Sequence, residues 1–311
     1  MKPFLSFFHS RGRRRAGAIG AGLVCALVGV AGCGSSETFE GRTSGDAIVV
    51  GSQDYYSNEI LAETYAQALE ASGYTVEREF RIGQREVYMP EIASGAIDVF
   101  PEYTGSLLQY LNPAATQTQA DEVYHALASV MPDGLSVADQ AEAADQDSYV
   151  VTQEMAERYE LKEIGDLARV NPLVLGGNSE LETRPYGPKG LESVYGVKVG
   201  FTPIEDSGGA LTVKALENNQ VQLVDLYSSD PVLANGKLKV LNDPKGLILA
   251  SRVVPVLSQR IDSRARDVIN RVSKELGPRD LVEMNRRSTA EAMSASAIAS
   301  QWLEEKGLPH K

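Results

Sequence analysis

The chain has 311 residues, enough for about two domains or lobes. A hydrophobic share of 43% and a charged share of 23% are typical of a soluble protein; they exclude a disordered tail, a collagen-like fibre and a multi-span membrane protein. The net charge of −12 argues against a nucleic-acid partner, because phosphate binding needs a basic surface. With two cysteines and three histidines, we expect no disulfide scaffold, no metal site and no cofactor.

A leader segment is predicted at the N-terminus. Four arginines precede the uncharged apolar stretch 16–31, which is shorter than the ~20 residues of a spanning helix but typical of a signal peptide. The sequence VAGC at 30–33 resembles a bacterial lipobox, whose cysteine receives a diacylglyceryl group. We therefore expect a lipoprotein signal peptide at 1–32, lipidation of Cys33 and a flexible tether at 33–46. An ordinary secretory peptide is the alternative.

The remaining sequence opens with alternating β and α patterns. Apolar periodicity predicts, in order, strand 47–51, a helix from 57 to the turn at Ser72-Gly73, strand 74–82, helix 86–94 and strand 97–100. A polar helix follows at 119–130. This order is typical of an α/β sheet flanked by helices.

A second set of elements has the same style. It comprises strand 148–152, helix 154–160, strands 173–177 and 197–201, helix 209–218, strands 221–226, 238–241 and 248–257, and helical segments 262–276 and 279–305. The strand at 148–152 would carry the chain into a second lobe, and the strand at 248–257 would carry it back. We therefore predict an α/β protein with a first lobe at 47–149 plus 251–311, a second lobe at 150–250, two crossover strands and a ligand cleft between the lobes.

Tyrosine is unusually common, with 13 residues against seven phenylalanines and one tryptophan. In an open α/β sheet the strand ends face the ligand crevice, and several tyrosines lie near predicted strand ends: Tyr55, Tyr56, Tyr103, Tyr149, Tyr186 and Tyr227. Aromatic ring faces can surround a cation, each contact contributing ~0.5–2 kcal/mol. A quaternary ammonium suits such a box because it is charged, weakly hydrated and has no N–H group. The alternative is that each ring is an amphipathic edge residue.

A ligand that also carries a carboxylate would need an anion site. Arg184 is the best basic candidate in a loop after a strand, because a guanidinium binds a carboxylate through two parallel hydrogen bonds. Ser52 and Ser106 lie where hydroxyls or backbone N–H groups could contribute. An ordinary surface charge is the alternative for Arg184.

Enzyme functions find little support. His125 is the only histidine between the leader and the last two residues, and its predicted helical position favours a partly exposed structural role. No Walker, HExxH or GxSxG motif occurs. Asp98 and Glu102 could act as an acid/base pair in an anchored hydrolase, but Asp98 is expected to be capping or exposed, and two carboxylates alone are a weak signal.

Five segments share features with a known family: VVGSQDYYSNEI at 49–60, GAIDVFPEYTG at 95–105, DQDSY at 145–149, TRP at 183–185 and LYSSD at 226–230. Together they resemble the extracytoplasmic substrate-binding proteins of glycine betaine/choline/carnitine-type ABC importers, the OpuAC-like family. The resemblance implies a type II periplasmic-binding-protein fold that closes on its ligand. It also implies a tyrosine box for a trimethylammonium group.

By position, the resemblance assigns this box to Tyr103, Tyr149 and Tyr227. It implies that Ser106 and Arg184 contact a ligand carboxylate and that Glu180 is a wall residue of the pocket.

Two positions depart from the family pattern. Gln53 stands where the family often has lysine, which removes a positive charge from the carboxylate end. Ser251 stands where a fourth box tyrosine is expected. The missing wall would then come from Tyr55, Tyr56 or Tyr186.

The sequence thus predicts a solute-binding protein and no enzyme. We expect it to be extracytoplasmic, lipid-anchored to the outer face of the cytoplasmic membrane, and to deliver a quaternary ammonium osmoprotectant to a separate ABC permease and ATPase complex. A receptor for another betaine-like or amino-acid-like solute is the main alternative, and an anchored hydrolase is the alternative of a different class.

Overall fold

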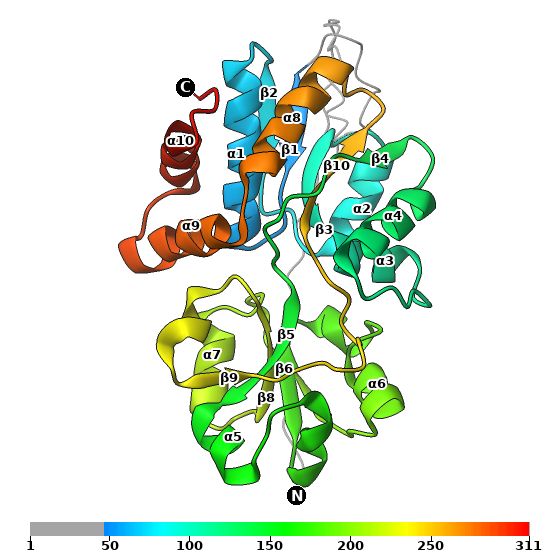
Figure 1. Ribbon diagram of the computed structural model, residues 1–311, viewed down its shortest axis with the longest axis vertical. Helices are drawn as coiled ribbons and strands as arrows, with labels where there is room; N and C mark the ends of the chain where they lie inside the picture. Colours follow the sequence, from blue (N-terminus) through cyan, green and yellow to red (C-terminus); the bar gives the residue numbers. More distant parts are fainter. Residues whose placement is uncertain (1–46, 311) are drawn as a thin grey trace, which may run out of the picture. The chain divides into compact units, whose positions relative to one another are not determined.

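The computed structural model describes residues 47–310, so the predicted signal peptide, Cys33 and the tether lie outside the described residues. Two mixed five-stranded sheets organise this part of the chain (Figure 1). The first has the order β2 (Val76–Glu79), β1 (Ile48–Gly51), β3 (Val99–Tyr103), β10 (Val253–Ser258), β4 (Leu135–Val137). The second has the order β7 (Gly200–Pro203), β6 (Val174–Gly177), β8 (Leu223–Tyr227), β5 (Asp147–Thr152), β9 (Leu238–Val240).

The first sheet is covered by helices on both faces because neighbouring strand residues point to opposite sides. Val50 and Val99 belong to the apolar cluster of α1, α8, α9 and α10, whereas Val49 and Phe100 belong to the cluster of α2, α3 and α4. The helices of this lobe are α1 (Tyr56–Ala71), α2 (Arg85–Ala93), α3 (Thr104–Leu111), α4 (Ala120–Val130), α8 (Ser263–Glu275), α9 (Pro278–Glu291) and α10 (Ala295–Glu305).

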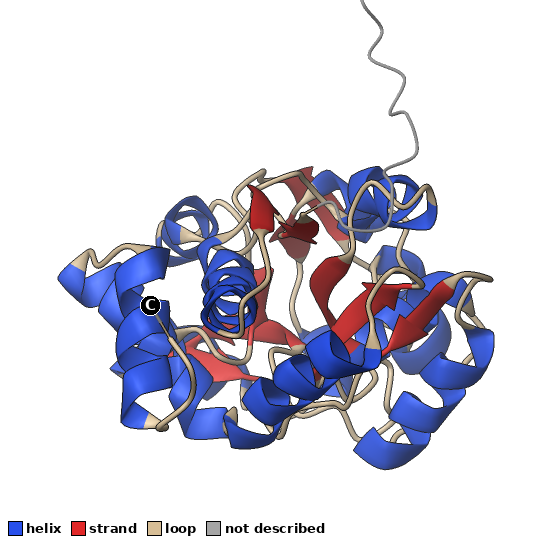
Figure 2. Ribbon diagram, turned by 90° about the horizontal axis from the view of Figure 1, so that it is seen from above, coloured by secondary structure: helices blue, strands red, loops and turns tan. Residues whose placement is uncertain are grey.

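The second sheet is buried in the same alternating way. Val151 packs in one apolar cluster and Val150 in another. Its helical segments are α5 (Gln153–Tyr159), η1 (Ile164–Arg169), η2 (Ser179–Glu182), α6 (Pro188–Gly190), η3 (Leu191–Tyr195), α7 (Ala210–Glu217) and η4 (Pro231–Asn235). In Figure 2 the strands lie inside and helices flank them. The predicted two-lobed α/β fold is therefore confirmed.

The chain passes between the two sheets along two adjacent segments. Ala144 forms an isolated antiparallel bridge with Arg252, and the Asp145 backbone N–H donates to the Ser251 carbonyl at 3.2 Å. β5 belongs wholly to the second sheet and β10 wholly to the first, so the residues just before each strand make the crossing. These segments bring the ends of β3, β5 and β8 close to one another.

Several element predictions need correction at the end of β3. The predicted strand at 97–100 stopped before Pro101, yet β3 continues to Tyr103, and Pro101 lies opposite Pro255 of β10. Helix α3 starts at the next residue and was not predicted. A Cβ at Gly105 would lie 2.6 Å from both the Leu249 carbonyl oxygen and Ser251 Oγ, so this close approach of backbones requires glycine.

Two further corrections concern short features. β4 was not predicted, since three residues carry too little periodicity to be recognised. The predicted helical segment 279–305 is two helices, because Ala292 adopts a left-handed conformation with φ of 52° and ends α9.

Candidate functional site

Aromatic residues from both lobes meet where the lobes are joined. Tyr55 precedes α1 and Tyr103 ends β3, both in the first lobe, while Tyr227 ends β8 in the second. The rings of Tyr55 and Tyr227 stack with centroids 4.9 Å apart and an interplanar angle of 28°. At this separation nothing fits between the two rings, so a cation could contact only their outer faces.

The two first-lobe phenols lie close to each other, and hydrogen bonds hold Tyr103. Asn58 Nδ2 donates to the Tyr103 hydroxyl at 3.3 Å and to the Pro101 carbonyl at 2.9 Å. Burial raises the pKa of both phenols well above the usual value, so both stay neutral and keep electron-rich faces without a charge.

Tyr149 and Tyr186 form a second aromatic group within the second lobe. The Tyr149 hydroxyl donates to the Tyr186 backbone carbonyl, and the Tyr186 hydroxyl accepts from Arg184 Nη1 at 3.2 Å. Tyr149 is 1% exposed and packs in the apolar core, which makes it a structural residue of the second lobe as well as a candidate box residue.

Arg184 reaches from the second lobe to the first. Its Nη2 lies 3.5 Å from the Glu86 carboxylate and donates to Gln84 Oε1 at 3.3 Å. With Ser106, Gln109 and Tyr186, Arg184 lines a cavity of about 210 Å³ between the lobes. Two of the predicted anion-binding side chains, those of Arg184 and Ser106, thus line one cavity, whereas Ser52 does not, and the guanidinium already has protein partners.

Ser106 faces acidic and hydroxyl groups. Its Oγ donates to Asp147 Oδ2 at 2.9 Å and lies 3.3 Å from Ser251 Oγ. Ser251 Oγ in turn accepts from the Ser106 backbone N–H at 3.1 Å and is buried beneath the start of α3. At this position a serine supports the α3 terminus, where the sequence pattern anticipated an aromatic ring.

Two further predicted site residues, Ser52 and Tyr56, already have hydrogen-bond partners within the protein. Ser52 Oγ is used within its own turn, donating to the Gln53 carbonyl and accepting from the Arg81 N–H. Tyr56 donates from its hydroxyl to Asp230 Oδ2 at 3.3 Å, across the lobes.

Two of the predicted residues keep buried atoms without hydrogen bonds. Gln53 Nε2 and Glu180 Oε2 are buried and have no hydrogen-bond partner among residues 47–310. Buried polar atoms are usually hydrogen-bonded, so these two have capacity for a ligand or water. The ligand roles assigned to all these residues stay predictions.

The expectation that Asp98 is capping or exposed was wrong. Asp98 is 1% exposed, accepting from the Val49 N–H at 3.0 Å and from Ser258 Oγ at 2.8 Å. Glu102 is fully buried and forms a bidentate pair with Arg85 at 2.7 and 2.9 Å. Burying a carboxylate is costly unless it is paired or hydrogen-bonded, which explains these partners. Both carboxylates are therefore occupied, and they form no accessible acid/base pair.

Sequence reasoning missed the acidic residues of the second sheet, Asp147 and Asp225. Their pattern was visible, because each stands two residues before a candidate tyrosine, Asp147 before Tyr149 and Asp225 before Tyr227. Residues two apart in a strand share a face. Asp147 is 4% exposed and accepts a hydrogen bond from Ser106, so a buried carboxyl group lies directly among the candidate side chains.

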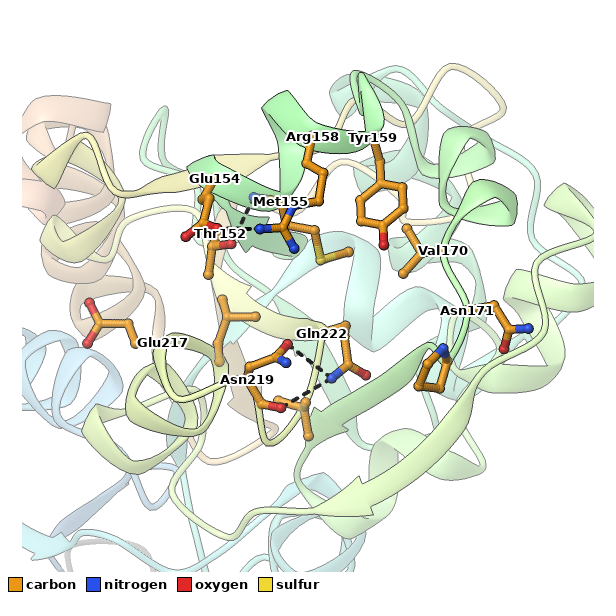
Figure 3. A pocket seen from close by; sticks show the side chains of 13 residues that line it. Thr152, Glu154, Met155, Arg158, Tyr159, Val170, Asn171, Glu217, Asn219 and Gln222 are labelled. Atoms are coloured by element: carbon orange, nitrogen blue, oxygen red, sulfur yellow. Dashed lines mark hydrogen bonds and ion pairs between the residues drawn. The ribbon is translucent and has the colours of Figure 1, made fainter.

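A separate cavity of about 300 Å³ lies in the second lobe beside α5 and α7 (Figure 3). Its side chains mainly pair with one another: Arg158 with Glu154, and Gln222 with Asn219. None of the predicted site residues lines it.

Residues 47–310 contain no cluster of acidic, histidine or cysteine side chains suited to a metal ion. The same part of the chain has no helix of the length and apolarity that crossing a bilayer requires.

Two α/β lobes joined by adjacent crossings, with aromatic and charged side chains of both lobes meeting there, define a bilobed substrate-binding protein of the type II periplasmic class. The family model described as the substrate binding domain of ABC-type glycine betaine transport systems, OpuAC, matches residues 46–305, and the chain belongs to this family. It is therefore the extracytoplasmic, non-catalytic binding component of an ABC importer.

Individual relatives agree with this assignment. The chain is 26% identical over 285 residues to the glycine betaine-binding protein YehZ of Escherichia coli K12, covering 84% of this chain and 90% of YehZ. A crystal structure of a glycine betaine/carnitine/choline ABC transporter protein aligns with a TM-score of 0.67 at 19% identity, over 84% of this chain and 99% of that one. An ABC-transporter choline-binding protein in complex with choline aligns with a TM-score of 0.62 at 15% identity, over 84% of this chain and 89% of the other.

Proposed function

We propose that the protein captures a small quaternary ammonium solute between its lobes, with Tyr103 and Tyr227 as aromatic walls. The observation that carries this proposal is the convergence of Tyr55, Tyr103 and Tyr227 from the two lobes at the crossing. Neutral phenols attract a cation through their ring faces by ~0.5–2 kcal/mol each, most strongly where water is excluded. The glycine betaine, choline and carnitine named for similar proteins all carry a trimethylammonium group.

Capture would couple to closure of the lobes about the crossing, with the lobe boundaries in the segments just before β5 and β10. Polar contacts that join the lobes support this: Gln84 Nε2 donates to Ser207 Oγ at 3.0 Å, and Arg184 approaches Glu86 at 3.5 Å. Such contacts are small and polar, so they can form and break as a ligand enters and leaves.

The proposal includes a lipid anchor at Cys33, based on the lipobox-like VAGC sequence at 30–33. The anchor would hold the receptor near its permease and ATPase partners. In bacterial cells producing the full chain, we expect membrane fractions to retain the protein and Cys33→Ser to release it. Equal retention of the two chains would contradict the anchor and leave ligand capture untouched.

The deciding experiment for capture is titration of purified protein with glycine betaine, choline and carnitine. We expect binding of at least one of them, and Tyr227→Ala to weaken it at least about tenfold, since one desolvated cation–π contact is worth up to ~2 kcal/mol. Tyr227→Phe keeps the ring and is the matched control, expected to bind nearly as well. Unchanged affinity in Tyr227→Ala would refute the role of this ring.

The sequence alternative of another betaine-like or amino-acid-like solute is tested with the same protein. A panel of such solutes is screened by thermal unfolding, because a ligand raises the melting temperature by mass action. A large shift with an amino acid and none with trimethylammonium compounds would replace the proposal by that alternative.

A further inference from the structure

Two carboxyl groups and two phenols share one face of the second sheet. The antiparallel register of β5 and β8 pairs Asp147 with Tyr227 and Tyr149 with Asp225. Residues directly opposite one another in such a pair lie on the same face, as do residues two apart in one strand. The four side chains therefore form a square, with the carboxyl groups on one diagonal and the phenols on the other.

The two carboxyl groups form one unit. The strand register places the carboxyl groups of Asp147 and Asp225 on one diagonal of this square, close enough to interact directly, and two such groups do not both ionise readily. Burial and the neighbouring Asp147 raise the pKa of Asp225 well above its usual value. The Ser148 N–H donates to Asp225 Oδ1 at 3.1 Å, and Ser106 Oγ donates to Asp147 Oδ2 at 2.9 Å. The pair thus carries a single negative charge.

Two guanidinium groups lie near the carboxyl pair. Arg184 lies 3.5 Å from Glu86 and also attracts Asp147 and Asp225, and Arg85 forms its bidentate pair with Glu102. These two positive charges face three negative ones, those of Glu86, Glu102 and the carboxyl pair, so the site keeps an excess negative charge beside the serine that was expected to receive a ligand carboxylate.

Resting on the proposed function, we propose that the Asp147–Asp225 pair makes the site selective for a quaternary ammonium ligand that bears a hydroxyl and no carboxylate. Choline is the compound that represents this class, and glycine betaine the zwitterion that it discriminates against. A ligand carboxylate placed at Ser106 would face the Asp147 carboxylate, which already accepts the hydrogen bond of the serine hydroxyl. The two like charges would repel each other. A ligand hydroxyl instead donates to the charged pair, and the ligand's positive charge compensates it.

The test compares affinities for choline and glycine betaine by calorimetry in the wild type, Asp225→Asn and the double variant Asp147→Asn, Asp225→Asn. The single variant replaces the protonated partner and keeps the negative charge of the pair, whereas the double variant keeps both side-chain sizes and removes the charge. We expect the wild type to bind choline at least about tenfold more tightly, and the double variant to lower the choline-to-betaine preference by about tenfold, the equivalent of ~1.4 kcal/mol. Asp225→Asn should keep most of the preference. Asp267→Asn, at an exposed position of α8, is the matched control and should leave the preference unchanged.

The outcomes separate the two proposals. A wild type that prefers glycine betaine, or a preference unchanged in the double variant, overturns the selectivity inference while the proposed capture of a quaternary amine stands. Binding of neither compound nor carnitine overturns the proposed function itself. Thermal unfolding without ligand identifies a double variant that does not fold, and the preference of the wild type for choline or glycine betaine then decides.

Discussion

Glu102 in the first lobe and Asp147 in the second are both buried acids beside the junction of the lobes, yet they are compensated in opposite ways. Glu102 is 0% exposed and has a dedicated guanidinium, that of Arg85, which is 4% exposed. Asp147 has a second carboxyl group beside it, that of Asp225, whose pKa burial and Asp147 raise well above the usual value. The first arrangement is a closed structural pair, whereas the second keeps a charge that a ligand can compensate.

The largest expected effect comes from breaking the closed pair. Arg85→Met leaves Glu102 buried without its cation, and removing one partner of a buried pair typically costs ~3–5 kcal/mol. We expect the free energy of unfolding, measured by urea denaturation, to fall by about that amount.

The double variant Arg85→Met, Glu102→Gln separates charge from packing. It removes the stranded charge, and the Tyr88 hydroxyl that donates to Glu102 can still reach the amide. We expect it to regain part of the lost stability. A double variant as unstable as Arg85→Met would show that packing, and not the uncompensated charge, causes the loss.

The difference between the two arrangements also shows which features could be predicted from the sequence. The order of most strands and helices, the two crossings and the proximity of Tyr103 and Tyr227 follow from local periodicity and position after strands. Asp147 and Asp225 stand 78 positions apart and meet only because β5 and β8 pair in one antiparallel register. This strand register is determined by the whole sheet, so no local sequence pattern predicts that the two residues meet.

The same limit applies to charged partners in the first lobe. Arg184 was recognised as a binding candidate, but its neighbour Glu86 comes from α2 of the other lobe. Helix α3 was missed because its start depends on a close contact between Gly105 and the segment before β10, about 145 positions later. In each case the sequence shows the residue type, but it does not show which distant residue will contact it.

The smaller expected effect concerns the pH dependence of the shared proton. Because the folded state raises the pKa of Asp225, it holds a proton that the unfolded chain has released above the ordinary aspartate pKa. Stability from this group is therefore complete below about pH 4 and is lost as pH rises toward the raised folded value, by at most ~1.4 kcal/mol per pH unit for one proton.

Asp225→Asn removes that proton, so unfolding free energies from pH 4 to 8 should fall less with rising pH than those of the wild type. Asp267→Asn, exposed on α8, should keep the wild-type slope. Parallel profiles for the wild type and Asp225→Asn would mean that the Asp147–Asp225 pair does not share a proton, and the contrast with Glu102 would then be one of partner identity alone.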